Sequence, residues 1–341
     1  MKMNSRGFSL IELLIAAALG LMVIGIGAGL YLASLAAYVG MQSRSSLAQD
    51  AVLMVDYLRN EMLSAGGGSV RAWMGIWVED NCAARGPFPN CGGSDRLTVS
   101  RATIPLQECA ITSQPSATIF QIAFTSPGVC CLSPGAGEVS YLSKPVIVTL
   151  DSNFTNKFVT AVDLASCRIT TKAGVNTLWD QTGGTTDWSG GNVTLMNVET
   201  LYLDKATNQL MRFIDAQADN VMDVGESVIV AIGIMDFQTI LGYDFIPADG
   251  NITASADGSS DEWLYNFPAE AYGAGSFTGS SFSRSALLMV SSGVILGVPD
   301  SSVKTSTQTQ KLFNGAAMGR VGWTYQSAIA ELAPRISYIF Q

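Results

Sequence analysis

The chain has 341 residues and a formal net charge of −9, from 19 Lys and Arg residues against 28 Asp and Glu. It contains no histidine, which excludes histidine-based catalytic triads, histidine general bases and histidine metal ligands. Binding to nucleic acid requires concentrated basic side chains, so this composition also argues against a nucleic-acid partner. The sequence has no phosphate-binding loop, dinucleotide-binding motif or nucleophile elbow. We therefore expect neither an enzyme nor a bound cofactor.

A short basic leader at the N-terminus is followed at once by a long apolar segment. Residues 13–33 carry no charge, and at about 1.5 Å per residue such a helix spans a bilayer core of about 30 Å. Lys2 and Arg6 precede the span, so we expect the chain to start in the cytoplasm and to place its bulk outside. Between Arg6 and Arg44 the only charged residue is Glu12. A carboxylate in lipid is unfavourable, so we expect a partner to compensate it.

The sequence Gly7-Phe8-Ser9-Leu10-Ile11-Glu12 resembles the class III signal of type IV pilins and pseudopilins. The resemblance implies that a prepilin peptidase removes residues 1–7, cutting between Gly7 and Phe8, and methylates the new Phe8 amine. It also implies that Glu12, fifth in the mature chain, neutralises the terminal amine of a neighbouring subunit during assembly. The alternative is an ordinary signal anchor, in which Glu12 only interacts favourably with the helix dipole.

The apolar pattern becomes one-sided after residue 37. Apolar residues then recur at spacings of three and four, which predicts an amphipathic helix that continues the membrane segment. These residues are Leu47, Ala51, Met54, Val55, Leu58 and Met62. Three glycines at 66–68 favour an end to the helix, so we expect one helix over 9–64 in a segment 8–65, followed by a β-rich head over 66–341. The expected fold is α+β, a long N-terminal helix packed on an antiparallel sheet.

Six cysteines, an even number, all lie in the expected head, as is usual for proteins of an oxidising compartment such as the periplasm. Cys82 and Cys91 enclose turn residues, which predicts a local disulfide contributing roughly 2.5–3 kcal/mol on the chain-entropy model. Zinc is the competing interpretation, but the chain has no C-x-x-C pair.

The other four cysteines include an adjacent pair, Cys130 and Cys131. Neighbouring cysteines rarely bond to each other without strain. We therefore expect each of them to pair with one of the two that remain, Cys109 and Cys167, in either combination.

The clearest β-hairpin is formed by residues 199–203 and 209–213 around a turn at 204–208. Polar, Gly-rich stretches at 174–192, 249–283 and 300–311 are typical of surface loops. Further strands are expected at 96–101, 118–124, 146–150, 158–162, 228–234, 237–243 and 286–296, with a closing segment at 323–339.

Several segments of the head extend the resemblance to the PilW-type minor pilins. They are Leu201-Tyr202-Leu203 with Leu210-Met211-Arg212, Ile234-Met235-Asp236-Phe237-Gln238 before Gly242-Tyr243-Asp244, then Trp263 and 287–290. Ala333-Pro334-Arg335 departs from the pattern, where an uninterrupted polar strand is expected. The resemblance implies a minor pilin that helps prime pilus assembly and sits at the filament tip. Its partners would be other minor and major pilins, the prepilin peptidase and the inner-membrane assembly platform, and the head would be periplasmic until the filament reaches the cell surface.

Two other functions fit the same residues. One is a minor pseudopilin of a type II secretion system. The other is a membrane-anchored adhesin or binding head, favoured by the Trp- and Gly-rich loops at 174–192 and 257–283.

An acidic cluster is a candidate calcium site within the head. It comprises Asp215, Asp219, Asp223 and Glu226. The spacing does not fit an EF-hand loop, and a solvated acidic turn is the favoured interpretation, so we expect no bound metal.

Overall fold

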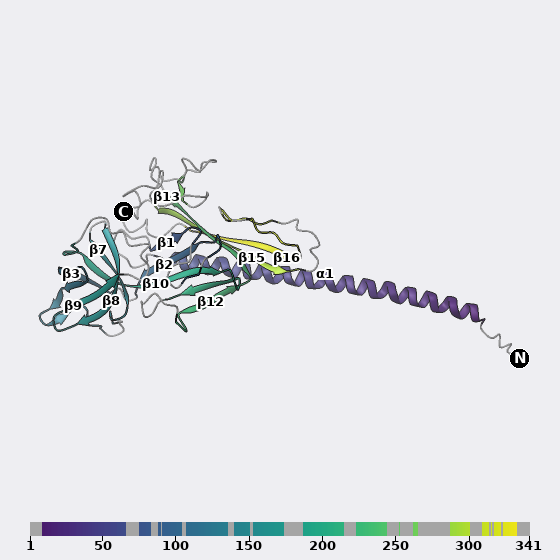
Figure 1. Cartoon of the computed structure of the whole chain (residues 1–341), viewed down its shortest axis with the longest axis horizontal. Helices are drawn as coiled ribbons and strands as arrows, with labels where there is room; N and C mark the ends of the chain where they lie inside the picture. Colours follow the sequence, from purple (N-terminus) through teal and green to yellow (C-terminus); the bar gives the residue numbers. More distant parts are fainter. Residues whose placement is uncertain are drawn as a thin grey trace.

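A long N-terminal helix projects from a β-rich head (Figure 1). The computed structural model describes residues 9–65, 75–82, 88–89, 91–103, 107–135, 140–150, 153–173, 187–214, 223–243, 252, 262–264, 287–300, 309–313, 315, 317–321 and 323–332. Helix and antiparallel sheet pack against each other, which confirms the expected α+β fold.

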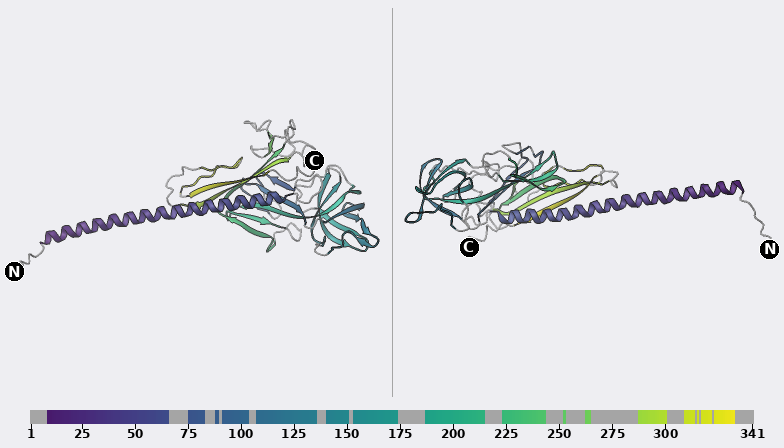
Figure 2. Two further views of the ribbon diagram at one scale, coloured as in Figure 1. Left: turned by 180° about the vertical axis from the view of Figure 1, so that it is seen from behind. Right: turned by 90° about the horizontal axis from the view of Figure 1, so that it is seen from below.

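Helix α1, Leu10–Ser64, is a single element of 55 residues, one residue shorter at its start than expected. Side chains over 9–39 are all exposed, and this half extends away from the head (Figure 2). The buried side of the other half begins at Gly40 and repeats every three or four residues. Its other members are Leu47, Ala51, Met54, Leu58 and Met62. The one-sided pattern of the sequence therefore marks the half of the helix that packs on the head.

The half of α1 that begins at Gly40 packs on two open antiparallel sheets. The first has the order β1-β2-β10-β11-β12, and the second the order β14-β13-β15-β16. Their bounds are Ile76–Glu79 (β1), Arg96–Ala102 (β2), Asn192–Asp204 (β10), Gln209–Phe213 (β11), Ser227–Ile232 (β12), Ile234–Tyr243 (β13), Trp263–Leu264 (β14), Leu287–Pro299 (β15) and Trp323–Leu332 (β16). We call these two sheets together with residues 40–64 of α1 the platform. Of strand β10, only residues 196–204 are counted as part of it.

The platform has one apolar core to which the helix and both sheets contribute. Leu58 and Met62 of α1 are essentially inaccessible and share the cluster with Leu97 of β2, Phe237 of β13 and Val294 of β15. Helix α1 packs mainly on β16, β15 and β2. The helix is therefore a layer of the platform rather than an appendage to it.

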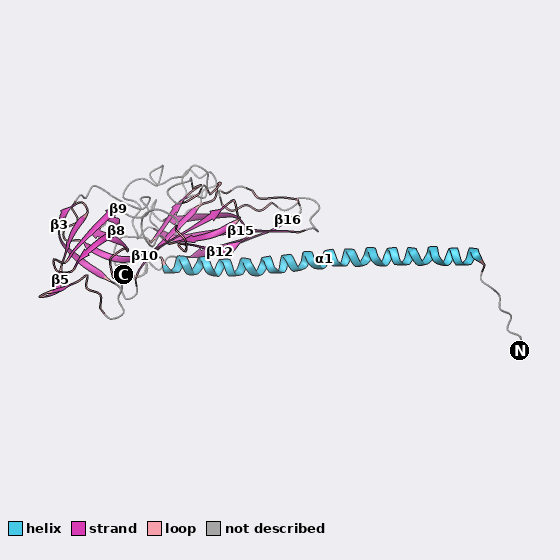
Figure 3. Cartoon of the chain, turned by 60° about the horizontal axis from the view of Figure 1, so that its bottom comes forward, coloured by secondary structure: helices cyan, strands magenta, loops and turns pink. Residues whose placement is uncertain are grey.

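Beyond the platform, five strands and the start of β10 close into a barrel (Figure 3). Pairing runs β10-β3-β4-β9-β8-β7 and returns from β7 to β10, antiparallel throughout. The additional bounds are Glu108–Ser116 (β3), Ile119–Ile122 (β4), Pro145–Leu150 (β7), Asn153–Asp163 (β8) and Arg168–Ala173 (β9), and a small hairpin joins Phe124–Ser126 (β5) to Val129–Cys130 (β6). The barrel has its own apolar cluster, centred on fully buried side chains such as Phe120, Val159 and Ile169.

The barrel is an insertion between two neighbouring strands of the platform. Ala102, the last residue of β2, pairs with Met196 of β10, so the chain leaves and re-enters the platform at adjacent positions. The first residues of β10, 192–195, pair with β3 and β7, whereas 196–204 pair with β2 and β11. One strand of 13 residues therefore belongs to both parts of the head.

The hairpin expected around 204–208 is confirmed, with Leu203 opposite Leu210 and Asn208 in a left-handed conformation (φ 53°). The strand expected at 118–124 is interrupted at Ala123, where β4 ends and the β5–β6 hairpin begins. Strands β1, β3, β6, β9 and β14 had no expected counterpart. The closing segment forms β16 as far as Leu332, and its expected remainder at 333–339 lies outside the described residues. Most of the three expected loops also lies outside them, at 174–186, 249–251, 253–261, 265–283 and 301–308.

Candidate assembly site

The first turn of α1 is closed by a capping box. The Ser9 hydroxyl accepts a hydrogen bond from the Ile11 amide (3.4 Å), and Glu12 Oε2 accepts one from the Ser9 amide (3.0 Å). Together these bonds satisfy donors that a helix start leaves unpaired. Glu12 therefore has a local role in starting the helix, in addition to the assembly role that the resemblance implies. Gly7 and Phe8, the expected processing residues, lie outside the described residues.

Residues 13–33 of α1 are apolar around the whole circumference of the helix. Within the described residues, α1 is the one helix long and apolar enough to cross a membrane, and none of its most apolar stretch is buried in the head. Leu21, Ile24 and Leu30 each expose about two thirds or more of their side chains. Such a surface is stable in lipid or against other apolar helices, which supports membrane anchoring.

An ion pair fixes the point at which α1 meets the head. Arg44 Nε lies 3.1 Å from Asp300 Oδ2, and the Asp300 side chain is fully buried at the end of β15. Arg44 is the first basic residue after the apolar span. This pair therefore marks the boundary between the exposed half of the helix and the platform.

A second charged cluster holds the other end of α1 on the first sheet. Arg101 of β2 donates to the Ser64 hydroxyl (2.7 Å) and to Glu61 (3.5 Å) through Nη1, and to Glu199 of β10 through Nη2. Arg212 of β11 approaches the second oxygen of Glu199 at 3.5 Å. The side chains of Glu61 and Glu199 are only 12% and 10% exposed, so the negative charge of each depends on these guanidinium groups for compensation.

Burial shifts the ionisation of this cluster. Desolvation, followed by the negative charge of Glu199, raises the pKa of Glu61, while Arg101 opposes the shift. Desolvation also raises the pKa of Tyr57, one turn earlier, and the charge of Glu61 adds to it. Both shifts disfavour the charged form, as expected where a helix covers charged side chains on a sheet.

The two sheets of the platform meet at buried polar side chains. Asp95, after the Cys82–Cys91 loop, accepts the amides of Asn81 and of Thr239 on β13, and its burial raises its pKa well above the ordinary value. Asp236 Oδ1 accepts the Ser94 hydroxyl at 2.6 Å. These bonds set the register of one sheet against the other.

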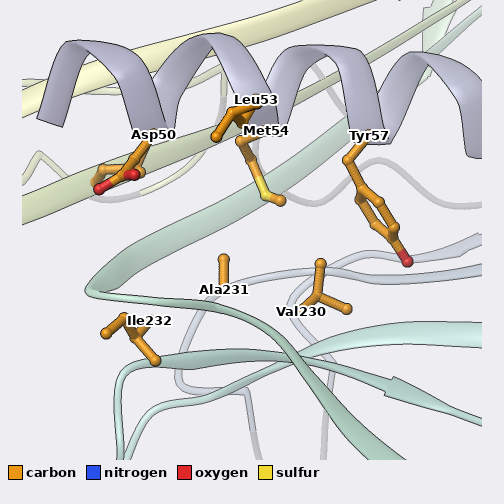
Figure 4. A pocket seen from close by; sticks show the side chains of 8 residues that line it. Asp50, Leu53, Met54, Tyr57, Val230, Ala231 and Ile232 are labelled. Atoms are coloured by element: carbon orange, nitrogen blue, oxygen red, sulfur yellow. The ribbon is translucent and has the colours of Figure 1, made fainter. Parts of the chain in front are cut away.

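An apolar groove of about 410 Å³ lies between α1 and strand β12 (Figure 4). Its walls are Leu53, Met54 and Tyr57 on the helix and Val230, Ala231 and Ile232 on the strand, with Leu296 and Asp50 also lining it. Leu53 and Ile232 expose 66% and 71% of their surfaces. The groove is therefore an accessible apolar surface beside the helix. The sequence did not reveal it, because its two walls are about 180 residues apart.

Three disulfides join the six cysteines, Cys82–Cys91, Cys109–Cys131 and Cys130–Cys167. The adjacent pair is thus divided between Cys109 and Cys167, as the strain argument predicts. The last two disulfides border a polar hollow of about 290 Å³ at the barrel, which Gln107, Thr125 and Tyr141 also line.

The acidic cluster is only partly within the described residues, because Asp215 and Asp219 lie outside them. Glu226 Oε2 accepts the Asp223 amide at 2.9 Å, which closes a local turn before β12. Among the described side chains, no group of three or more acidic or sulfur ligands is placed to hold a metal ion.

In the comparison with known families, residues 2–28 match the prokaryotic N-terminal methylation motif. This supports a type IV pilin or pseudopilin. The motif covers the leader, Glu12 and most of the apolar span, and it implies processing by a prepilin peptidase and assembly with other pilins. No curated protein and no solved structure matches the chain. The head with its inserted barrel therefore has no counterpart in these comparisons.

Proposed function

We propose that this chain is a minor pilin of the PilW type, which helps prime type IV pilus assembly at the inner membrane and takes its place at the filament tip. The observation that carries the proposal is the methylation motif on a helix whose half over 10–39 is exposed and, except for Glu12 and Ser34, apolar. The role is structural rather than catalytic. Before assembly, this half of α1 anchors the subunit in the membrane. The Glu12 carboxylate then attracts the terminal amine of a neighbouring pilin and aligns the two subunits, and a low dielectric strengthens this attraction.

The position of the barrel supports a place for this subunit at the filament tip. It lies at the end of the head farthest from the N-terminus of α1 (Figures 1 and 2). In a filament whose subunits stack along their helices, the barrel would occupy space that the next head requires. A subunit at the tip has no such neighbour, so the insertion is tolerated there.

The test separates the charge of Glu12 from its role in the capping box. Glu12→Gln retains the capping interaction, because Gln can fill the same position, but it removes the charge. We expect Glu12→Gln and Glu12→Ala to be cleaved, methylated and held in the membrane, yet depleted in sheared filaments relative to the membrane pool. Asp56→Ala, which removes an exposed carboxylate elsewhere on α1, should be incorporated like the wild type. Intact mass should show loss of residues 1–7 and one added methyl group in every variant, and a mature chain that retains residues 1–7 would contradict the proposal.

Equal incorporation of Glu12→Gln and wild type would contradict the assembly role of the charge. Immunogold labelling of sheared filaments tests the tip position separately, because a tip subunit labels filament ends only.

A membrane-anchored binding head is the second candidate function, favoured by the polar hollow at the barrel. Deletion of the gene separates the candidates. Loss of all filaments indicates priming, normal filaments with lost attachment indicate a binding head, and loss of secretion with normal filaments indicates a minor pseudopilin.

A further inference from the structure

Strand β12 forms an edge of the first platform sheet, because its one partner among the described strands is β11. The Ile214 amide donates to the Glu226 carbonyl at 2.9 Å, immediately before the strand. Hydrogen-bonded and non-hydrogen-bonded pairs alternate along an antiparallel ladder. The pairs of Ser227 and Ile229 with β11 are therefore of the non-hydrogen-bonded kind, and the backbone N–H and C=O groups of these two residues face away from the sheet.

The part of this edge before the register shift lacks two of the usual protections against pairing with another chain, namely charge and proline. Natural edge strands are blunted by charged side chains, proline or bulges. β12 has the sequence Ser-Val-Ile-Val-Ala-Ile, with neither charge nor proline, and the register shift in its ladder occurs after Ile229. Val228, Ile229 and Ile232 expose 47%, 51% and 71% of their surfaces. On the edge of the other sheet, β16 exposes Ile329 to 42% but also the polar Gln326 and the charged Glu331.

The groove beside β12 offers space for the side chains of such a partner. It runs along two turns of α1, from Asp50 to Tyr57, and its walls are apolar (Figure 4). Asp50 lies at one end of the row of labelled side chains and is exposed. A strand added to β12 would place apolar side chains against Leu53 and Ile232, and a Lys or Arg near Asp50.

Chain direction decides which strand fits the edge. β10 starts in the barrel and runs towards the membrane end of the platform, and β12 runs the same way, because each is antiparallel to β11. A second copy anchored in the same membrane has its β12 in the same direction, so these two strands could not pair antiparallel. β16 runs in the opposite direction, from Trp323 near Asp300 to Leu332, but its exposed Glu331 and Gln326 are unsuited to an apolar groove.

We propose that the edge of β12 and the adjoining groove bind an extended, mainly apolar segment of a different membrane-anchored pilin subunit, as an added antiparallel strand. This deepens the proposed function, on which it rests, by naming the surface through which the subunit meets a partner head. Backbone hydrogen bonds to Ser227 and Ile229 supply the pairing, and the groove selects the side chains.

The experiment uses a photo-crosslinking amino acid in the full-length protein in its native cells. The probe p-benzoylphenylalanine is placed at Ile229 or Ile232, with Ile329 of β16, exposed to 42%, as the matched control. We expect adducts from both β12 positions, in the membrane pool before filament assembly, to an extended segment of another chain with its own N-terminal methylation motif. Position 329 should give no such adduct.

A charge on the edge provides the second measurement. Ile229→Lys should lower the yield of the adduct from position 232 by about tenfold, a change of about 1.4 kcal/mol, whereas Ile329→Lys should leave it unchanged. Adducts to lipid, to a second copy of this chain, or of equal yield at position 329 would overturn the proposal, as would no adduct at all. Because cleavage of the leader and methylation of Phe8 are read from the same samples by mass, failure of the proposed function is recognised separately.

Discussion

The platform and the barrel stabilise their cores in different ways. The platform consists of open sheets and takes α1 as a further layer, with Leu58 and Met62 at the centre of its cluster. The barrel closes its own ring of hydrogen bonds, and the described members of its cluster include no residue of α1. It also contains two of the three disulfides. Changes to the helix should therefore affect the platform alone, whereas loss of the disulfides should affect the barrel.

The largest effect is expected from removing the barrel disulfide that closes the longer loop of the chain. The Cys130–Cys167 bond closes a loop with a sequence separation of 37, for which the chain-entropy model gives a contribution of about 4 kcal/mol. Cys130→Ser with Cys167→Ser should raise amide hydrogen exchange in β4, β8 and β9 of the detergent-purified protein, with little change in β13 and β15. Equal acceleration in both regions would show that the barrel and platform unfold together. Cys82→Ser with Cys91→Ser is the control outside the barrel.

Shortening a core side chain of the helix should instead accelerate hydrogen exchange in the platform and leave the barrel unchanged. Leu58 is fully buried in the platform cluster, and Leu→Ala at such sites costs about 3 kcal/mol. Leu58→Ala should accelerate exchange in β2, β15 and β16 and leave β8 and β9 unchanged. Leu53→Ala, on the same helix but 66% exposed, should stay within about 0.5 kcal/mol of wild type. Protection of β15 and β16 equal to that of the wild type would contradict the helix's place as a layer of the platform.

Removing Arg101 should weaken the attachment of α1 more modestly. Arg101→Met leaves Glu61 and Glu199 without their closest guanidinium, at a cost of about 2 kcal/mol. Exchange should rise in the last turns of α1 and in β2. Arg59→Met replaces an exposed arginine of the same helix and serves as the control. If both variants behave alike, the cluster does not hold the helix in place.

The smallest effect is expected on acidification, where the stability of the platform and the stability of the barrel should change in opposite directions. In the platform, the folded pKa values of Asp95 and Glu61 are raised above 3.8 and 4.5, mainly by burial. The folded state then binds more protons than the unfolded state between the ordinary and the raised pKa values, so platform stability should increase as the pH falls through that range towards the ordinary values.

In the barrel, hydrogen bonds from the hydroxyl and amide of Ser166 hold the pKa of Asp163 below its ordinary 3.8. Its contribution is complete above pH 3.8 and is lost only below that value. Urea titrations at several pH values, read by limited proteolysis with mass-spectrometric assignment of the cut sites, would compare the two regions. Loss of platform stability as the pH falls towards 4.5, the ordinary value for Glu61, would contradict the assignment.

Local patterns were sufficient to predict the helix, the β10–β11 hairpin and the division of the adjacent cysteines. Spacings of three and four placed Leu47, Leu58 and Met62 on one face, and the structure buries all three. The processing and assembly residues were predicted from a motif of six residues. In each of these cases the information lies within one segment of the chain.

The barrel and the attachment of the helix could not be predicted in the same way. β3 and β9 are rich in polar residues, and β3 contains Pro115, so their sequences do not resemble strands of a core. Closure of the barrel depends on a change of partners near Leu195 of β10, a property of the assembled sheet. Arg44 and Asp300 are 256 residues apart, so no local pattern connects them.

The shared strand β10 has a mechanical consequence. A pull on the barrel, with α1 held in a membrane or filament, reaches the platform at Ala102 and Met196, which are paired neighbours. β2 and β10 are then loaded from the same end, as the two legs of one hairpin. Tension is passed sideways to β1 and β11 as shear along several hydrogen bonds at once, rather than by opening them one after another. The insertion point is thus suited to a subunit that bears load at its far end.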